Sequence, residues 1–172
     1  MPCALLKGGH IYKMSQPITI YTDGSARGNP GPGGYGVVLI SGKHRKEISQ
    51  GYRLTTNNRM ELLSVIVALE ALKAEGCDVT IYSDSKYVVE AVEKGWLQEW
   101  VRKNFKKKKN VDLWLRFLDI YKKHRVRFVW VKGHANNAEN NVCDKLAVDA
   151  SSMPDLLVDE AYEEMKDDTD LF

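Results

Sequence analysis

Apolar residues along this chain follow two spacings, strict alternation and helical periodicity, and these spacings predict its secondary structure. Strands are predicted where β-branched and aromatic residues alternate with polar ones, and helices where apolar residues recur every three to four positions. The predicted strands are residues 18–23, 35–40, 47–54, 79–83 and 126–131. The predicted helices are residues 59–75, 85–93, 111–123 and 141–152. Residues 28–34 are rich in Gly and Pro and predict a loop.

The order of these elements predicts an α/β fold built on a mixed sheet. The first three strands follow one another directly, which favours an antiparallel meander, whereas the later strands alternate with helices. A helix between two strands favours a right-handed crossover to a parallel neighbour. We therefore expect an antiparallel hairpin that is continued by parallel strands.

Length and composition limit the class of protein. The chain has 172 residues, of which 44% are hydrophobic and 28% charged, as is typical of one globular domain. No apolar run approaches the roughly 18 residues of a membrane helix, and the apolar run at residues 4–6 is too short for a signal peptide. Three scattered cysteines, Cys3, Cys77 and Cys143, lack metal-ligand spacing and favour a reducing, cytoplasmic location.

Charge is unevenly distributed along the chain, although the net charge is only +2. Residues 86–127 hold 13 Lys and Arg against 5 Asp and Glu, or +8, whereas residues 154–172 hold 1 Lys against 8 acidic residues, or −7. A basic region on a near-neutral protein favours a polyanionic partner, although a solvated surface explains a charge run equally well. We expect a flexible leader at residues 1–16, one domain at residues 17–152, and a tail at residues 153–172 that is too acidic to join the core.

A short repeat places an aspartate at the end of two predicted strands. The segments that end in Asp23 and Asp84 read TIYTD and TIYSD, so both aspartates have the same phase in the pleat. If these strands are parallel neighbours, both carboxylates reach the carboxyl edge of the sheet, where open α/β sheets place their sites. Two close carboxylates require a cation or a raised pKa. The alternative is that each aspartate caps the turn after its strand.

Two further carboxylates have the same double interpretation. Glu61 follows Asn58 by three residues, which is the spacing of a capping box, and Asp144 lies in the first turn of the last predicted helix. Either side chain can instead point toward the sheet edge. Four carboxylates without paired His or Cys suit Mg²⁺ or Mn²⁺ better than zinc, although spacing alone does not show that the four meet.

Two predicted loops are candidates for a catalytic or a nucleotide-binding role. His134 lies in a polar loop after the last predicted strand, where a histidine is commonly just exposed but where a proton shuttle would also stand. Residues 28–34 lack the Gly-Lys-Ser/Thr ending of a phosphate-binding loop, so we expect no nucleotide cofactor.

Residues 95–109 combine large aromatic side chains with a run of lysines. Trp96 and Trp100 are four residues apart and share a helical face, and the run includes Lys106 and Lys107. Lysines neutralise phosphates while aromatic rings pack on sugars or bases. The alternative is that the tryptophans belong to the core and the lysines are solvated. We expect at least one of the two tryptophans to contact a ligand.

Six motifs together resemble the signatures of type 1 ribonuclease H of the bacterial kind, in the order of that family and over residues 17–152. The motifs are TDGS at 22–25, GNPGPGGYG at 28–36, TTNNRMEL at 55–62, SDS at 83–85, NVDLW at 110–114 and WVKGHA at 130–135. The resemblance implies a ribonuclease H-like fold, with a five-stranded mixed sheet flanked by helices. It also implies an endonuclease that hydrolyses the RNA strand of RNA–DNA hybrids and leaves 3′-hydroxyl and 5′-phosphate ends.

The resemblance further implies roles for individual residues. It assigns catalysis to five residues, of which all but the last also bind metal: Asp23, Glu61, Asp84, Asp144 and His134. The positions implied to contact nucleic acid are Asn29, Thr56, Asn57, Asn58 and Lys86, and, in a basic protrusion, Trp96, Trp100, Lys106 and Lys107. Relatives often carry glutamine at the Lys86 position, and the protrusion is shorter before Asn110 than in common bacterial forms.

The implied mechanism uses two Mg²⁺ ions, or Mn²⁺, and the implied partner is an RNA–DNA hybrid. Apart from the resemblance, we expect no membrane partner, because no apolar run is long enough, and a monomer, because no amphipathic surface is left over. One alternative is a hybrid-binding module without catalysis, against which the five intact residues argue. Another is the same chemistry on double-stranded RNA or single-stranded nucleic acid, against which the basic protrusion argues. A reverse-transcriptase-associated domain is a third alternative, but 172 residues leave no room for a polymerase in this chain.

Overall fold

The computed structural model of this protein describes residues 4–7, 10–13, 16–133 and 137–170, and its side chains over residues 16–133 and 137–167. Its centre is a five-stranded mixed sheet. The strands are β3 (Ile18–Ala26), β4 (Gly31–Ser41), β5 (His44–Thr55), β6 (Asp78–Ser83) and β7 (Arg125–Trp130). They lie in the order β5-β4-β3-β6-β7, with antiparallel pairs on the β5 side of β3 and parallel pairs on the β7 side. The predicted antiparallel hairpin continued by parallel strands is therefore confirmed.

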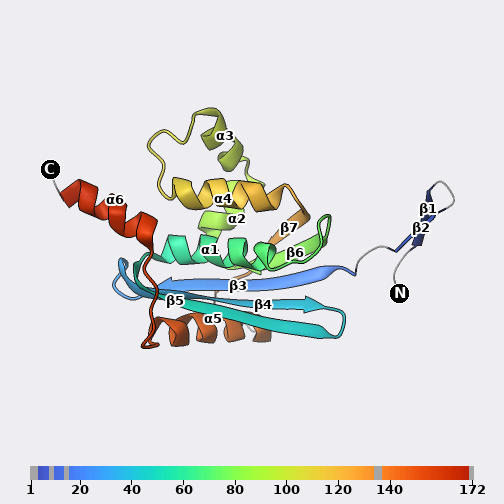
Figure 1. Ribbon diagram of the computed structural model, residues 1–172, viewed down its shortest axis with the longest axis horizontal. Helices are drawn as coiled ribbons and strands as arrows, with labels where there is room; N and C mark the ends of the chain where they lie inside the picture. Colours follow the sequence, from blue (N-terminus) through green and yellow to red (C-terminus); the bar gives the residue numbers. More distant parts are fainter. Residues whose placement is uncertain (1–3, 8–9, 14–15, 134–136, 171–172) are drawn as a thin grey trace.

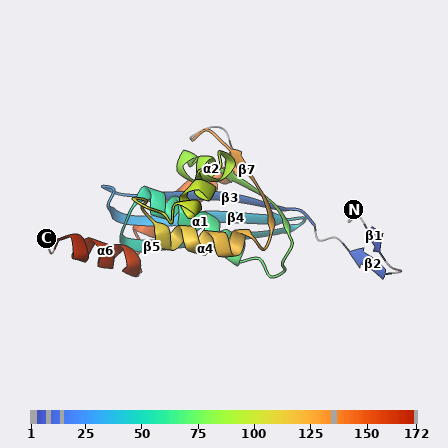
Figure 2. The same ribbon diagram turned by 90° about the horizontal axis from the view of Figure 1, so that it is seen from above.

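Helices cover both faces of this sheet. They are α1 (Asn57–Glu70), α2 (Lys86–Glu93), α3 (Trp96–Arg102), α4 (Val111–Tyr121), α5 (Ala138–Ser151) and α6 (Glu160–Asp170). Figure 1 shows α1, α2 and α4 on one face and α5 on the other, and Figure 2 shows the same layers from above. Among the described residues, no helix is both long enough and apolar enough to cross a membrane.

The TIYTD and TIYSD segments are parallel neighbours in matching register. Thr19, Ile20 and Tyr21 of β3 pair with Thr80, Ile81 and Tyr82 of β6. The rings of the two tyrosines stack with their centroids 5.0 Å apart. Because equivalent residues of the two segments pair with each other, both strands end together at the carboxyl edge of the sheet.

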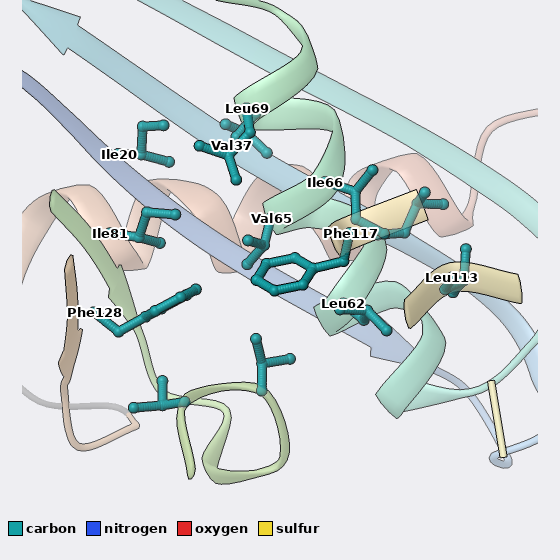
Figure 3. Packing of buried hydrophobic residues seen from close by; sticks show 14 of the residues in the cluster. Ile20, Val37, Leu62, Val65, Ile66, Leu69, Ile81, Leu113, Phe117 and Phe128 are labelled. Atoms are coloured by element: carbon teal, nitrogen blue, oxygen red, sulfur yellow. The ribbon is translucent and has the colours of Figure 1, made fainter. Parts of the chain in front are cut away.

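The hydrophobic core lies between the sheet and the layer of α1 and α4. Figure 3 looks into this core, where side chains from α1 face those of the central strands. The labelled residues come from β3, β4, β6, β7, α1 and α4, and are Ile20, Val37, Leu62, Val65, Ile66, Leu69, Ile81, Leu113, Phe117 and Phe128. Each is 8% exposed or less. This packing holds the N-terminal half of α1 over the end of β3.

The glycine-rich stretch predicted as a loop belongs largely to the sheet. β4 already begins at Gly31, and Gly34 and Gly36 pair with Ser25 and Asp23 of β3. A Cβ atom at Gly34 would lie 2.6 Å from a carbonyl oxygen of α5, and one at Gly36 only 2.2 Å. These glycines therefore serve close packing rather than a turn, which the sequence pattern alone does not distinguish.

The two ends of the chain add local structure to the segments predicted as leader and tail. In the leader, β1 (Ala4–Lys7) and β2 (His10–Lys13) form a separate antiparallel pair. In the tail, Leu157 runs beside β5, where its N–H donates to the Gly51 carbonyl and its carbonyl accepts from the Arg53 N–H. Helix α6 follows and extends beyond the end of the sheet in both views (Figures 1 and 2).

Candidate active site

Three carboxylates from three different elements meet at the carboxyl edge of the sheet. Asp23 lies in β3, Glu61 lies in α1, and Asp84 directly follows β6. One oxygen atom from each carboxylate lies within 4.8 Å of the others. The matching register of β3 and β6 explains the two aspartates, because parallel strands end at the same edge.

Gly24 allows the third carboxylate to join this pair. A Cβ atom at Gly24 would lie 2.4 Å from the backbone nitrogen of Glu61, so any side chain there would push α1 away from the sheet. The Gly24 N–H also donates to Asp23 Oδ1 at 2.9 Å and thereby orients that carboxylate. One glycine thus sets both the approach of the helix and the direction of the strand-end carboxylate.

The capping-box interpretation of Glu61 is wrong. The N-cap of α1 is Thr56, whose hydroxyl accepts the Arg59 N–H, and Asn58 lies inside the helix. Because the helix starts earlier than the sequence pattern predicts, Glu61 lies beyond its first turn and has no orphan N–H to satisfy. Its Oε2 atom is instead buried, with no hydrogen-bond partner among the described residues.

Asp144 reaches the same edge from α5. It lies in the second turn of that helix, not in the first as predicted. Gly36, the β4 partner of Asp23, has the Cys143 carbonyl where its Cβ would be, so α5 lies directly on the strand. Asp144 is exposed, and it lines one small cavity together with Asp23 and Asp84.

Burial and mutual repulsion disfavour negative charge in this cluster. Burial raises the pKa of Asp23 to about 7, and the charges of Asp84 and Asp144 act in the same direction, although hydrogen bonds from Glu61 and Gly24 oppose them. Burial, and then the charges of Asp23 and Asp84, raise the pKa of Glu61 well above its ordinary value. The cluster therefore favours either bound protons or a bound cation.

The donor set and the available space both fit a divalent cation. The cavity has a volume of about 20 Å³, and a water-sized species needs roughly 10–15 Å³. Carboxylate oxygens are the ligands that Mg²⁺ and Mn²⁺ prefer. Glu61 does not line this cavity, but one of its carboxylate oxygens lies within 4.8 Å of an oxygen of Asp23 and of Asp84, and its Oε2 is buried without a hydrogen-bond partner in the described part of the chain.

The cavity also includes residues that the sequence did not single out. Asn140 lines it, and its Oδ1 atom is buried without a hydrogen-bond partner in the described part of the chain. An asparagine in a polar stretch gives no sequence signal for this position. Lys132 and Gly133 also line the cavity, whereas His134 lies outside the described residues, so its place beside the cluster stays a prediction.

A comparison with protein families identifies the family to which the chain belongs. The family model described as RNase H matches residues 15–152, which include all four carboxylates. The chain belongs to the RNase H family.

Individual RNase H relatives agree over most of the chain. Ribonuclease H of Syntrophus aciditrophicus is 56% identical over 150 residues, covering 84% of this chain and 86% of the relative. Ribonuclease H of Rippkaea orientalis is 54% identical over 151 residues, covering 85% and 92%. Among solved structures, LC9-RNase H1, a type 1 RNase H with the type 2 active-site motif, superimposes with a TM-score of 0.72 at 31% identity, covering 90% of this chain and 82% of that one. LC11-RNase H1 in complex with an RNA/DNA hybrid gives 0.59 at 28% identity, covering 84% and 99%.

Several of the predicted nucleic-acid contacts lie together at the start of α1. Asn29 Oδ1 accepts the Asn57 N–H at 2.9 Å, and Asn57 Oδ1 accepts the Ala26 N–H at 2.6 Å. Because these side-chain oxygens are engaged, the two asparagines can offer a ligand their amide NH₂ groups. Thr56 caps the helix beside them, and Asn58 is exposed.

Lys86 lies on the same edge of the RNase H sheet. It is exposed at the start of α2, and its ammonium group lies 5.3 Å from the ring centroid of Trp130. Trp130 in turn donates its indole N–H to the Asp84 carbonyl at 3.2 Å. The exposed Lys86 is therefore held close to the strand end that carries Asp84.

The two tryptophans of the basic protrusion differ in their surroundings. Trp100 packs edge-on against the fully buried Trp114 at 5.5 Å, so it supports the core. Trp96 is 42% exposed, and the ammonium group of Lys94 lies 5.2 Å from its ring centroid. Trp96 is therefore the more exposed of the two rings, and contact of either ring with a ligand stays a prediction.

The lysine run of the protrusion is held at both ends. Lys106 and Lys107 are exposed, whereas the preceding Phe105 is buried and donates its N–H to the Trp100 carbonyl at 2.7 Å. At the other end, Asn110 donates its side-chain N–H to the Tyr87 hydroxyl at 3.1 Å. The run is therefore a short, anchored segment that presents cations to solvent.

A buried arginine next to the site was not among the residues predicted from the sequence. Arg59 is 1% exposed and pairs with Asp112 at 2.8 Å and with Asp159 at 2.7 Å. It occupies an apolar position of the helical repeat that continues through Leu62 and Ile66. A charged residue at such a position was the sequence signal for a buried ion pair. The expectation that the tail is too acidic for the core is wrong for Asp159, which is 8% exposed because Arg59 neutralises it.

Proposed function

We propose that this protein is an endonuclease that hydrolyses the RNA strand of RNA–DNA hybrids and leaves 3′-hydroxyl and 5′-phosphate ends. The observation that carries the proposal is the cluster of Asp23, Glu61 and Asp84 at the carboxyl edge of an RNase H sheet, with Asp144 on the same cavity. The relatives named Ribonuclease H support the activity, and LC11-RNase H1, solved with an RNA/DNA hybrid, supports the substrate.

Metal binding falls to the four carboxylates in this proposal. Asp23, Glu61, Asp84 and Asp144 would hold Mg²⁺ or Mn²⁺, with two ions in the site when substrate is bound. When bound, the ions supply an activated water and stabilise the leaving 3′-oxygen. The side chains themselves orient the ligand oxygens, exclude water from the buried side of the cluster and release protons as cations bind.

In this proposal, the surfaces on either side of the carboxylate cluster bind the substrate. Asn29, Asn57 and Asn58 would donate amide N–H groups to the nucleic-acid backbone and minor groove, and the protrusion would bind phosphates of the DNA strand through Lys106 and Lys107. Backbone contacts position a duplex without specifying sequence, so weak sequence preference is expected. The 2′-hydroxyl and the sugar shape distinguish the two strands.

We further propose a cytoplasmic monomer that uses no nucleotide cofactor. Cys77 and Cys143 are buried free thiols, and burial raises the pKa of Cys143 to about 12, so its thiol is unreactive. Such thiols suit a reducing compartment. His134 would assist proton transfer or product departure, and its loss should reduce activity less than loss of Asp23.

The test is cleavage of a 5′-labelled RNA strand annealed to DNA, with Mg²⁺ or with EDTA. Wild type should cut the RNA internally only with the metal, and Asp23→Asn should lower the rate by a factor on the order of 10³ or more, because a ligand of the ion that activates water is lost. Asp155→Asn is the matched control, since Asp155 is an exposed aspartate of the tail. It should cut at the wild-type rate.

Parallel substrates separate the alternatives. Tight hybrid binding without cleavage in either Mg²⁺ or Mn²⁺ would show a binding module and contradict the enzymatic proposal. Equal cutting of double-stranded RNA or single-stranded RNA would contradict the substrate class while leaving the metal chemistry intact.

A further inference from the structure

The guanidinium of Arg59 has a partner for every one of its N–H groups. Nε and Nη2 donate to the two oxygens of Asp159 at 2.7 and 2.9 Å, and Nη1 and Nη2 donate to the two oxygens of Asp112 at 2.9 and 2.8 Å. Nη1 also donates to Asn110 Oδ1 at 3.4 Å. An arginine has five N–H donors in a fixed planar fork, so these five bonds determine its position and that of its partners.

These bonds join three segments that are far apart in the sequence. Arg59 belongs to the first turn of α1, directly after the Thr56–Asn58 motif. Asn110 and Asp112 lie where the lysine run ends and α4 begins. Asp159 precedes α6 in the acidic tail. One buried side chain therefore connects the two predicted nucleic-acid-binding regions with the C-terminal segment.

Asp159 is itself fixed from its own side. The Thr55 hydroxyl donates to Asp159 Oδ2 at 3.0 Å, and two residues earlier Leu157 hydrogen-bonds through its backbone to β5. The ring of Tyr162 lies 5.7 Å from the guanidinium carbon of Arg59 and covers it from the tail side. These contacts hold the Asp159 carboxylate in one orientation toward Arg59.

The acidic cluster does not depend on this network for its own geometry. Asp23 and Asp84 are placed by the β3–β6 pairing, and Glu61 by the contact of α1 with Gly24. Loss of the Asp159 contact should therefore change how a duplex is held while leaving the arrangement of the carboxylates unchanged.

We propose that Asp159 is a positioning residue, which through Arg59 holds the Thr56–Asn58 motif and the lysine run in the relative arrangement that binds a nucleic-acid duplex. This inference rests on the proposed function and adds a role in substrate binding for the acidic tail. In this proposal the tail does not contact the substrate. Its Asp159 carboxylate holds Arg59 in place, and Arg59 sets the distance between the Thr56–Asn58 motif and the lysine run.

The test compares Asp159→Asn with Glu163→Gln in the full-length chain. Glu163 is the matched control because it also joins the tail to the domain, through Arg53 at the surface, but within the described part of the chain its side chain makes no hydrogen bond or ion pair with Arg59. Steady-state cleavage of a hybrid is measured at a temperature where circular dichroism shows every variant to be folded. Asp159→Asn should raise KM about 5- to 10-fold, as expected for breaking one coupled buried network, with kcat changed by less than about twofold. Glu163→Gln should leave both parameters unchanged.

Hybrid binding as a function of salt gives a readout that a merely structural role would not move. It is measured by fluorescence anisotropy in the Asp23→Asn background, which prevents cleavage. If the lysine run is displaced, the slope of log K against log salt should become shallower by about 1 for each lost phosphate contact. Should Asp159→Asn fail to fold, Asp112→Asn cuts the same network from the lysine-run side, at a carboxylate that is 35% exposed, and should give the same rise in KM.

Three results would overturn the inference. The first is a folded Asp159→Asn or Asp112→Asn protein with unchanged KM and salt slope. The second is a fall in kcat at constant KM, which would place the defect in the carboxylate cluster. The third is a wild type that neither binds nor cuts the hybrid, and only this result also removes the proposed function.

Discussion

Helix α1 carries two ionisable side chains, Arg59 and Glu61, that lie two residues apart in opposite electrostatic surroundings. Glu61 joins Asp23 and Asp84 in a cluster of carboxylates, and burial and repulsion raise the pKa of both Glu61 and Asp23. Arg59 binds Asp112 and Asp159, and although burial alone would raise the pKa of Asp112, hydrogen bonds from Arg59 hold it below its usual range.

The difference lies in where the cation comes from. In the Arg59 network the protein supplies a permanent cation, so the carboxylates are neutralised at all times and the network stabilises the fold. In the acidic cluster the cation has to come from solution, so the cluster opposes folding without a cation and favours metal binding. Because Arg59 and Glu61 are only two residues apart in α1, the network restrains the helix directly beside the residue that the cluster destabilises.

The largest expected effect comes from removing the permanent cation. Arg59→Met leaves two carboxylates partly or fully buried without a counter-charge, which should lower the free energy of unfolding by about 3–5 kcal/mol. Urea unfolding followed by circular dichroism measures it. Arg53→Met is the matched control, because Arg53 is exposed and pairs only at the surface with Glu163. Equal stability of Arg59→Met and Arg53→Met would show that the network contributes nothing to the fold.

Removing a charge from the acidic cluster should raise the free energy of unfolding, by less than the loss of Arg59 lowers it. In metal-free protein the pKa of Asp23 is about 7, and in the unfolded chain it is about 3.9. The folded state therefore retains a proton that the unfolded state releases, so the Asp23 contribution to stability falls as pH rises from about 4 to 7. At pH 8 in EDTA, Asp23→Asn should raise the free energy of unfolding by about 2 kcal/mol, discounted for the charges that remain.

The pH profile sharpens this second prediction. Wild type in EDTA should lose stability between about pH 4 and 7, whereas Asp23→Asn should show a flatter profile over the same range. Saturating Mg²⁺ should restore stability to wild type above pH 7 and have little effect on Asp23→Asn. A wild type that is more stable at pH 7 than at pH 5 by the same margin as the variant would contradict the strained-cluster interpretation.

The smallest effect should come from the exposed ion pair of the same tail. Arg53 is 60% exposed and Glu163 20% exposed, so solvent screens their attraction. Glu163→Gln should change the free energy of unfolding by less than about 0.5 kcal/mol. Thermal unfolding measures it, and a change as large as that of Arg59→Met would show that the tail is held mainly at its surface.

The sequence predicted much of the fold because its signals are local. Alternation and helical periodicity marked the strands and helices, and the TIYTD and TIYSD segments predicted the parallel pair that carries Asp23 and Asp84. Helix starts were less certain, because Thr56, Asn57 and Asn58 are all good caps and only the folded chain shows that Thr56 is used.

The tail and the glycine-rich stretch could not be predicted, because both depend on partners distant in sequence. Gly34, predicted as part of a loop, lies in β4, and its missing side chain leaves room for α5, about a hundred residues further along the chain. Asp159 is buried because Arg59 reaches it across a sequence separation of 100 residues. No local pattern carries that information, although a charged residue at an apolar position of α1 indicated that some partner must exist.

The backbone pairing of Leu157 with β5 has a further consequence for the protein in solution. β5 is an outer strand of the sheet, and the unpaired N–H and C=O groups of such an edge are a template for strand addition by other molecules. The tail occupies this edge at Gly51 and Arg53, while the opposite end of β5 carries Arg45, Lys46 and Glu47, which discourage an approaching strand. The C-terminal segment thus covers a part of the sheet edge that another strand could otherwise pair with.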